Sequence, residues 1–124
     1  MKTRVDYTLG DREERPWGRW EVIAIGDDLV VKHLIVRPGF RSSMQRHSGR
    51  NEHWIILQGE LEATVNGETR TLKTADHTYI SVGSLHRMHN VGSSPVAMIE
   101  IQTGHHLSED DIERLEDDFG RASA

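Results

Sequence analysis

The chain has 124 residues, which is close to the commonest size of a single domain, so one hydrophobic core is expected. It contains no cysteine, which excludes disulfides, thiolate metal sites and cysteine nucleophiles, so any metal must be bound by nitrogen and oxygen. A net charge of −5 without a dense basic tract excludes nucleic acid as an expected partner.

No apolar run approaches the roughly 20 residues that cross a bilayer, and the amino terminus lacks the apolar region of a signal peptide. We therefore expect a cytoplasmic protein with no membrane partner. Residues 1–14 are polar, show no sustained period, and are predicted to form an arm. The segment Arg15-Pro16-Trp17-Gly18 marks the start of the core.

From Trp20 onward, short runs of residues alternate between apolar and polar, as in half-buried strands; they include 20–24, 31–36 and 54–57. Turn residues separate these runs at intervals of roughly 8–12 residues, which is typical of a sandwich or barrel. Asn66-Gly67 is the strongest hairpin signal, because both residues tolerate the positive φ of a type I′ turn. The pattern predicts an all-β, jelly-roll-like barrel.

The carboxyl-terminal stretch instead has the pattern of a short helix. Ser108 can cap its amino end and Gly120 can stop it. Acidic residues suit the positive end of the helix dipole, and apolar residues fall on one face. The acidic residues are Asp110 and Asp111, and the apolar residues are Ile112, Leu115 and Phe119. We predict one domain over residues 15–121, preceded by the arm.

Two polar clusters contain the candidate metal ligands. Gln45 and His47 are two residues apart, so they share one face of an extended strand, and Glu52 follows them. The second cluster holds His86 at the start of another predicted strand. An amide oxygen, two imidazoles and a carboxylate suit zinc, iron, cobalt, nickel or manganese, and leave positions for water or substrate.

The spacing of these clusters resembles the two cupin motifs. It reads Gly-x5-Gln-x-His-x4-Glu-x6-Gly over residues 39–59 and Gly-x2-His-x3-Asn over residues 83–90. The glutamine stands where most cupins have a first histidine, and the resulting ligand set is similar to that of phosphomannose isomerases. Further segments resemble the type II phosphomannose isomerase domain, so that the likeness covers residues 15–121; they are 15–18, 50–54, 78–80, 86–87, 100–104 and 109–121.

The resemblance implies a cupin barrel, that is, a double-stranded β-helix, and a divalent metal ion, with zinc as first choice. It also implies an aldose–ketose isomerase that interconverts mannose 6-phosphate and fructose 6-phosphate or a similar sugar. In that family the domain commonly follows a guanylyltransferase domain, but no Gly-rich phosphate loop precedes Arg15, so nucleotide-sugar synthesis is not expected here. Two departures are Gly49, where the family has a further histidine, and Ser81, where it has proline. Gly49 bears on the substrate pocket rather than on the metal.

Several further residues are candidates for contact with the substrate. Arginine forks match phosphate oxygens, although surface solvation accounts equally well for any one of these arginines; they are Arg41, Arg50, Arg87 and Arg121. Glu100 and Gln102 share one strand face, which the family pattern places inside the cup. Glu100 and His89 are the candidates for the general base.

Two other functions fit the same sequence: another metallo-cupin enzyme, such as a dioxygenase or an epimerase, and a non-catalytic sugar-binding module. We also expect a homodimer, because the arm 1–14 has nothing evident to pack on and small barrels pair through edge strands.

Overall fold

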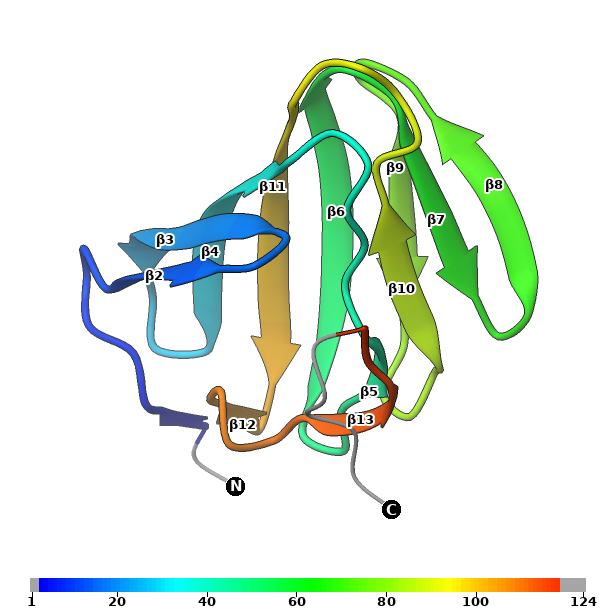
Figure 1. Ribbon diagram of the computed structural model, residues 1–124. Coiled ribbons are helices and arrows are strands. Elements are labelled where there is room, and N and C mark those ends of the chain that lie inside the picture. The colour runs from blue at the N-terminus through cyan, green and yellow to red at the C-terminus, as the bar shows by residue number, and fades with distance from the viewer. Residues whose placement is uncertain (1–2, 119–124) are drawn as a thin grey trace.

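The computed structural model describes residues 3–118, which form two larger sheets and one short strand pair (Figure 1). The six-stranded sheet has the order β2 (Arg12–Arg15), β3 (Gly18–Ile25), β4 (Leu29–Val36), β11 (Val96–Gly104), β6 (Arg50–Gln58) and β9 (His77–Ile80). The five-stranded sheet has the order β13 (Glu113–Glu116), β5 (Met44–Arg46), β10 (His86–His89), β7 (Leu61–Val65) and β8 (Glu68–Leu72). Strands β1 (Arg4–Val5) and β12 (His106–Leu107) pair in parallel. The described residues contain no helix, and the prediction of an all-β fold is confirmed.

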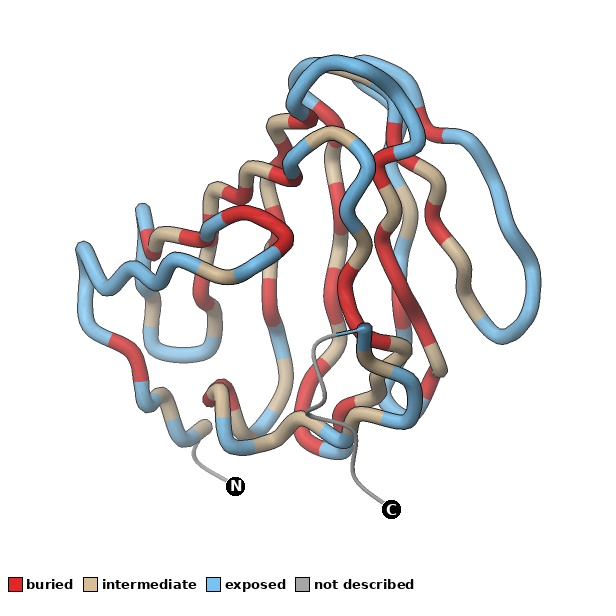
Figure 2. Tube along the Cα trace, in the orientation of Figure 1, coloured by how far each residue is buried: buried red, intermediate tan, exposed pale blue. Residues whose placement is uncertain are grey.

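The inward faces of β4, β6 and β11 are divided into an apolar end and a polar end. Burial alternates along these strands, as Figure 2 shows, and residues such as Val36, Ile56 and Met98 pack into the apolar core. The same inward rows continue into buried polar residues, namely Lys32, Arg50, Glu52, Glu100 and Gln102. Strand β11 ends where β5, β12 and β13 gather in Figure 1. These buried polar residues make the polar end of the barrel the candidate location of a functional site.

The predicted hairpin is present between β7 and β8. Val65 pairs with Glu68, and the two loop residues Asn66 and Gly67 have φ values of 49° and 83°. Both values lie in the left-handed region that a type I′ turn requires, which explains the Asn-Gly sequence.

The prediction of a carboxyl-terminal helix is wrong. Residues 108–111 form turns and bends, and β13 pairs with β5 at one edge of the five-stranded sheet. The carboxylate of Asp111 accepts hydrogen bonds from the backbone N–H groups of Ser48 and Gly49, so it serves the loop after β5 instead of a helix dipole. An ion pair of 2.8 Å between Arg46 and Glu113 adds to the strand pairing. Phe119 and Gly120 lie outside the described residues.

The segment before the core is tied to the barrel. Strand β2 pairs with β3, and β1 lies against β12. Between them, Tyr7 is buried, with its ring edge-to-face on Trp20 at a centroid distance of 5.9 Å. The homodimer and the boundary at residue 15 stay predictions. No helix of the described residues is long and apolar enough to span a membrane.

Candidate metal centre and active site

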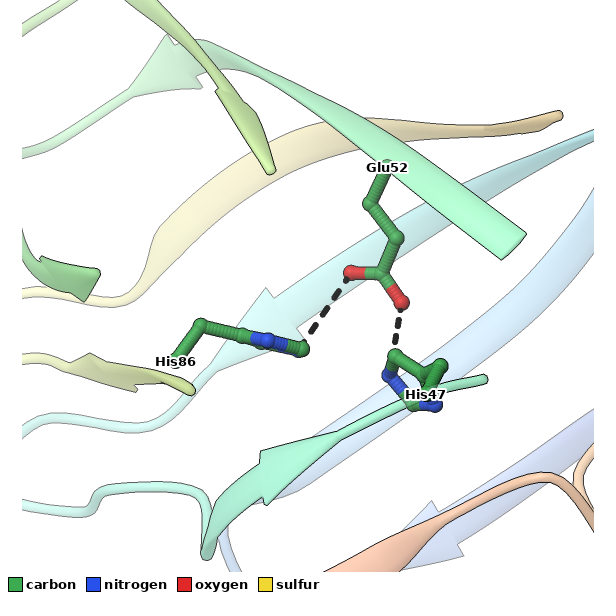
Figure 3. A group of neighbouring side chains, drawn as sticks. All are labelled: His47, Glu52 and His86. Atoms are coloured by element: carbon green, nitrogen blue, oxygen red, sulfur yellow. Dashed lines mark ion pairs between the residues drawn. The ribbon is translucent and has the colours of Figure 1, made fainter. Parts of the chain in front are cut away.

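Three potential metal ligands converge at the polar end of the barrel. His47 follows β5, Glu52 lies on β6 and His86 begins β10, and all three are buried. One ligand atom from each lies within 4.8 Å of the other two. In Figure 3 both imidazoles face the Glu52 carboxylate, with Nε2 of His47 at 2.9 Å and Nε2 of His86 at 3.8 Å.

The two imidazoles are oriented by backbone carbonyl groups. The Nδ1–H of His47 donates to the carbonyl of Asp111 at 3.0 Å, and that of His86 donates to the carbonyl of Ser84 at 2.9 Å. With Nδ1 engaged by a carbonyl oxygen, each ring turns its Nε2 atom toward Glu52. Histidine ligands of metals are held by such hydrogen bonds, so this orientation fits a metal centre.

The fourth predicted ligand, Gln45, lies on the neighbouring strand. Its Cα is the direct partner of His86 in the pairing of β5 with β10. Its side chain lines the same cavity as Glu52 and His86. The structure thus brings all four residues to one end of the barrel.

The charge states of the buried groups suit metal binding. Burial alone would raise the pKa of Glu52, but the guanidinium group of Arg50 holds it well below its usual value. Arg50 donates from Nε to one carboxylate oxygen at 3.0 Å, and Trp54 donates from Nε1 to the other at 2.9 Å. Burial lowers the pKa of His86, which keeps the ring neutral. An ionised carboxylate and neutral imidazoles are the forms that bind divalent ions.

A cavity of about 50 Å³, which opens to solvent, lies beside these residues. This volume is below the range of small-molecule sites, about 300–1,000 Å³, so a ligand of that size would extend from the cavity into its open mouth. Its wall combines aromatic rings with charges of both signs: Trp17, Trp20 and Trp54; Arg15, Lys32, Arg50 and Arg114; and Glu52, Glu100 and Glu109. Such a wall can hold a polar, anionic ligand.

Glu100 faces this cavity from β11. Burial and the neighbouring Glu52 raise its pKa to about 7, so the carboxyl group is balanced between its acid and base forms at neutral pH. Gln102 donates from Nε2 to Glu100 at 2.9 Å. The Oε1 atom of Gln102 is buried and has no hydrogen-bond partner among the described residues, and Gln102 itself does not line the cavity.

Other predicted site residues lie away from the cavity. Arg41 pairs with Asp118 at 2.6 Å, and Arg87 donates to the carbonyl of Ser42 at 2.9 Å. His89 follows Met88, which lines the cavity, so strand alternation directs the histidine to the opposite face. Arg121 lies outside the described residues. Among the described residues, Arg50 is the one arginine predicted to contact the substrate that lines the cavity.

Sequence reasoning missed five polar residues of this region: Tyr7, Arg15, Lys32, Glu109 and Arg114. Lys32 could have been found, because it shares strand parity with Val30 and Leu34, which are buried. Tyr7 and Glu109 gave no local signal, since their hydrogen bond joins positions 102 residues apart in the sequence.

The two-sheet barrel with a histidine and carboxylate cluster inside one end is a cupin. Solved structures with the same fold include KdgF from Halomonas sp., with a TM-score of 0.71 and 19% identity over 82% of this chain and 91% of that chain. The cupin domain of Cnp3 from Schizosaccharomyces pombe gives a TM-score of 0.69 and 16% identity, covering 74% of this chain and 68% of that one.

Within this fold, the chain belongs to the family described as mannose-6-phosphate isomerase C-terminal, whose model matches residues 2–117. The alginate biosynthesis protein AlgA of Pseudomonas aeruginosa is 45% identical over 109 residues, which are 88% of this chain and 23% of the relative. A mannose-1-phosphate guanylyltransferase of Escherichia coli is 41% identical over 118 residues, which are 95% of this chain and 25% of the relative. The chain therefore spans about a quarter of the length of these relatives.

Proposed function

We propose that the chain is a metal-dependent isomerase that interconverts mannose 6-phosphate and fructose 6-phosphate, or a similar aldose and ketose, in the cytoplasm. The observation that carries the proposal is the buried group of His47, Glu52 and His86 beside the buried acid Glu100. Membership of the mannose-6-phosphate isomerase family supports the choice of substrate.

A divalent ion held by Gln45, His47, Glu52 and His86, zinc being the first choice, would supply Lewis-acid charge for the oxygens that become negative during enediolate formation. The chain's own residues supply the proton transfer. Glu100 in its ionised form removes the proton from carbon 2 and returns it to carbon 1. A pKa of about 7 suits both halves of this exchange, because the group gains and loses a proton at similar cost.

The neighbours of Glu100 have positioning roles in this proposal. Gln102 fixes one carboxylate oxygen of Glu100 by its 2.9 Å hydrogen bond. Tryptophan rings in the cavity wall limit the access of water to the reacting carbons. His89 is the less suitable base, because strand alternation directs it away from the cavity that Met88 lines.

The direct test is to incubate metal-loaded protein with mannose 6-phosphate and to measure fructose 6-phosphate, with metal content and folding verified. Chelation should abolish the product and re-addition of the ion should restore it. Glu100→Gln should lower kcat by about 10²–10⁴-fold, whereas Glu113→Gln, on exposed β13, should not. Loaded, folded protein that binds the sugar phosphate without turnover would replace this proposal with a non-catalytic sugar-binding module.

A further inference from the structure

The carboxylate of Glu109 lies in a cage of donors at the wall of the cavity. Tyr7 donates its hydroxyl hydrogen to Oε2, and Lys32 Nζ donates to the same oxygen at 2.9 Å. Nη2 of Arg15 donates to Oε1 at 3.3 Å, and Nη1 of Arg50 lies 4.0 Å from Oε2. Three cationic groups and one hydroxyl thus surround a single carboxylate.

The cage is a built feature of the barrel. The side chains of Lys32 and Arg50 are only 3% and 4% exposed, and Lys32 Nζ also lies 3.9 Å from the centre of the Trp20 ring. The side chain of Glu109 is 25% exposed. The anion is therefore more exposed than Lys32 and Arg50, and within the cage only Arg15, with a side chain 22% exposed, is comparable.

The Glu109 carboxylate compensates the buried positive charge of Lys32. A buried ammonium group without a nearby anion is strongly unfavourable, and Glu109 forms an ion pair with Lys32 at 2.9 Å. Other anions already engage the two arginines: Glu13 lies 2.6 Å from Arg15, and Glu52 lies 3.0 Å from Arg50. Removal of Glu109 therefore leaves chiefly Lys32 and the Tyr7 hydroxyl in need of an oxyanion.

The backbone that carries Glu109 allows its carboxylate to leave the cage, so that a ligand anion can take its place. Residues 108–111 form turns and bends between β12 and β13 rather than a helix or strand. Asp111 fixes the middle of this segment to Ser48 and Gly49, while Glu109 reaches the cage by its side chain. A change of side-chain rotamer would move the carboxylate into water, where an ionised group is well solvated.

We propose that this cage binds the phosphoryl group of the substrate, and that Glu109 is an internal occupant which the phosphoryl group displaces. The proposal rests on the proposed function, because it needs a phosphorylated ligand. A phosphoryl dianion carries more charge and one more terminal oxygen than a carboxylate, so it matches a cage of one hydroxyl and several cationic donors better. Glu109 keeps Lys32 compensated when the substrate is absent.

The experiment measures the binding of inorganic phosphate to the full chain by calorimetry, in the presence of a chelator so that phosphate cannot bind a metal ion. Glu109→Gln removes the internal competitor and should tighten phosphate binding about tenfold, the scale of one charge-assisted hydrogen bond. Glu113→Gln is the matched control. It makes the same change of charge four positions further along the chain, at a carboxylate that pairs with exposed Arg46. The control should leave the affinity at the parental value.

Parental or weaker phosphate affinity in folded Glu109→Gln protein would overturn the proposal. If that variant does not fold, Arg15→Gln tests the cage in its place, because Arg15 is partly exposed and contributes one donor. It should weaken phosphate binding about tenfold, and an unchanged affinity would overturn the proposal. Neither measurement needs turnover, so a chain without isomerase activity can still pass, and an active isomerase can still fail.

Discussion

The Nδ1–H of His47 donates to the backbone carbonyl of Asp111 across 3.0 Å, so the segment before β13 orients one imidazole of the candidate metal centre. The side chain of the same aspartate accepts from the hydroxyl of Ser48 at 2.7 Å and from the N–H of Gly49 at 2.7 Å. Asp111 therefore holds both the ring of His47 and the loop that follows it.

Asp111→Ala should weaken metal binding without removing any ligand. The loop after His47 loses its side-chain acceptor, and the loss of such supporting contacts costs about 10–100-fold in metal affinity. The free energy of unfolding should fall by about 1–3 kcal/mol. Competitive metal titration and denaturant unfolding measure the two effects. Asp118→Asn is the control, because that carboxylate pairs with Arg41 away from the cavity. Equal metal affinity in the Asp111 variant and the control would show that His47 is oriented without this contact.

Metal binding should stabilise the folded chain through His86. A ligand at a hundredfold excess over its Kd stabilises the native state by about 2.7 kcal/mol, so added zinc should raise the Tm of the parent protein. His86→Gln should lose most of this rise. His89→Gln is the matched control, because it lies on the same strand and alternates to the other face. A zinc-dependent rise of the same size in all three proteins would place the ion elsewhere.

The ion pairs of Glu109 should make stability depend on pH in the acid range. Burial alone would raise its pKa, but Lys32 and Arg50 lower it from 4.5 to about 2. The folded state thus binds fewer protons than the unfolded state between these values. The stabilisation, about 3 kcal/mol, is complete above the unfolded pKa of 4.5 and is lost as the pH falls toward 2.

Comparison of the parent protein with Glu109→Gln isolates this contribution. The parent should be more stable at neutral pH, and the difference in unfolding free energy should shrink as the pH falls below about 4.5. Denaturant unfolding over a series of acid pH values measures it. A difference that is the same at about pH 6 and about pH 3 would mean that packing, and not charge, accounts for the effect of Glu109.

Local patterns were sufficient to predict the strands and the gathering of the four candidate ligands. Alternation over residues 31–36 and 99–102 indicates strands because successive side chains must face opposite sides of a sheet, and both runs lie within observed strands. The positive φ at Asn66 and Gly67 follows from residue type alone. Motif spacing and strand periodicity are local properties, so a single sequence displays them.

The contacts that close the site could not be predicted in this way. The helix predicted after Ser108 satisfied every local rule, but the Asp111 carboxylate binds a loop 62 residues earlier in the chain instead of a helix end. The cage around Glu109 combines residues from the predicted arm and from the predicted helix. Both errors have one cause: hydrogen bonds between distant segments outweigh the weak intrinsic preference of a short segment.

Gly49, the departure from the family's usual histidine, should be intolerant of any side chain. A Cβ at this position would lie 2.6 Å from Cβ of His106 and 3.0 Å from Oδ2 of Asp111. The space beside the metal centre is thus filled by a residue of β12, so the loss of the family histidine leaves no gap. Gly49→Ala should lower the unfolding free energy by about 1–3 kcal/mol. It should also weaken metal binding, because Asp111 must shift.

Gly92→Ala is the control, since its Cβ would meet only Asn90 at 3.4 Å. Unchanged stability and metal affinity in Gly49→Ala would show that His106 of β12 moves aside at little cost. Position 49 could then accept the family's histidine.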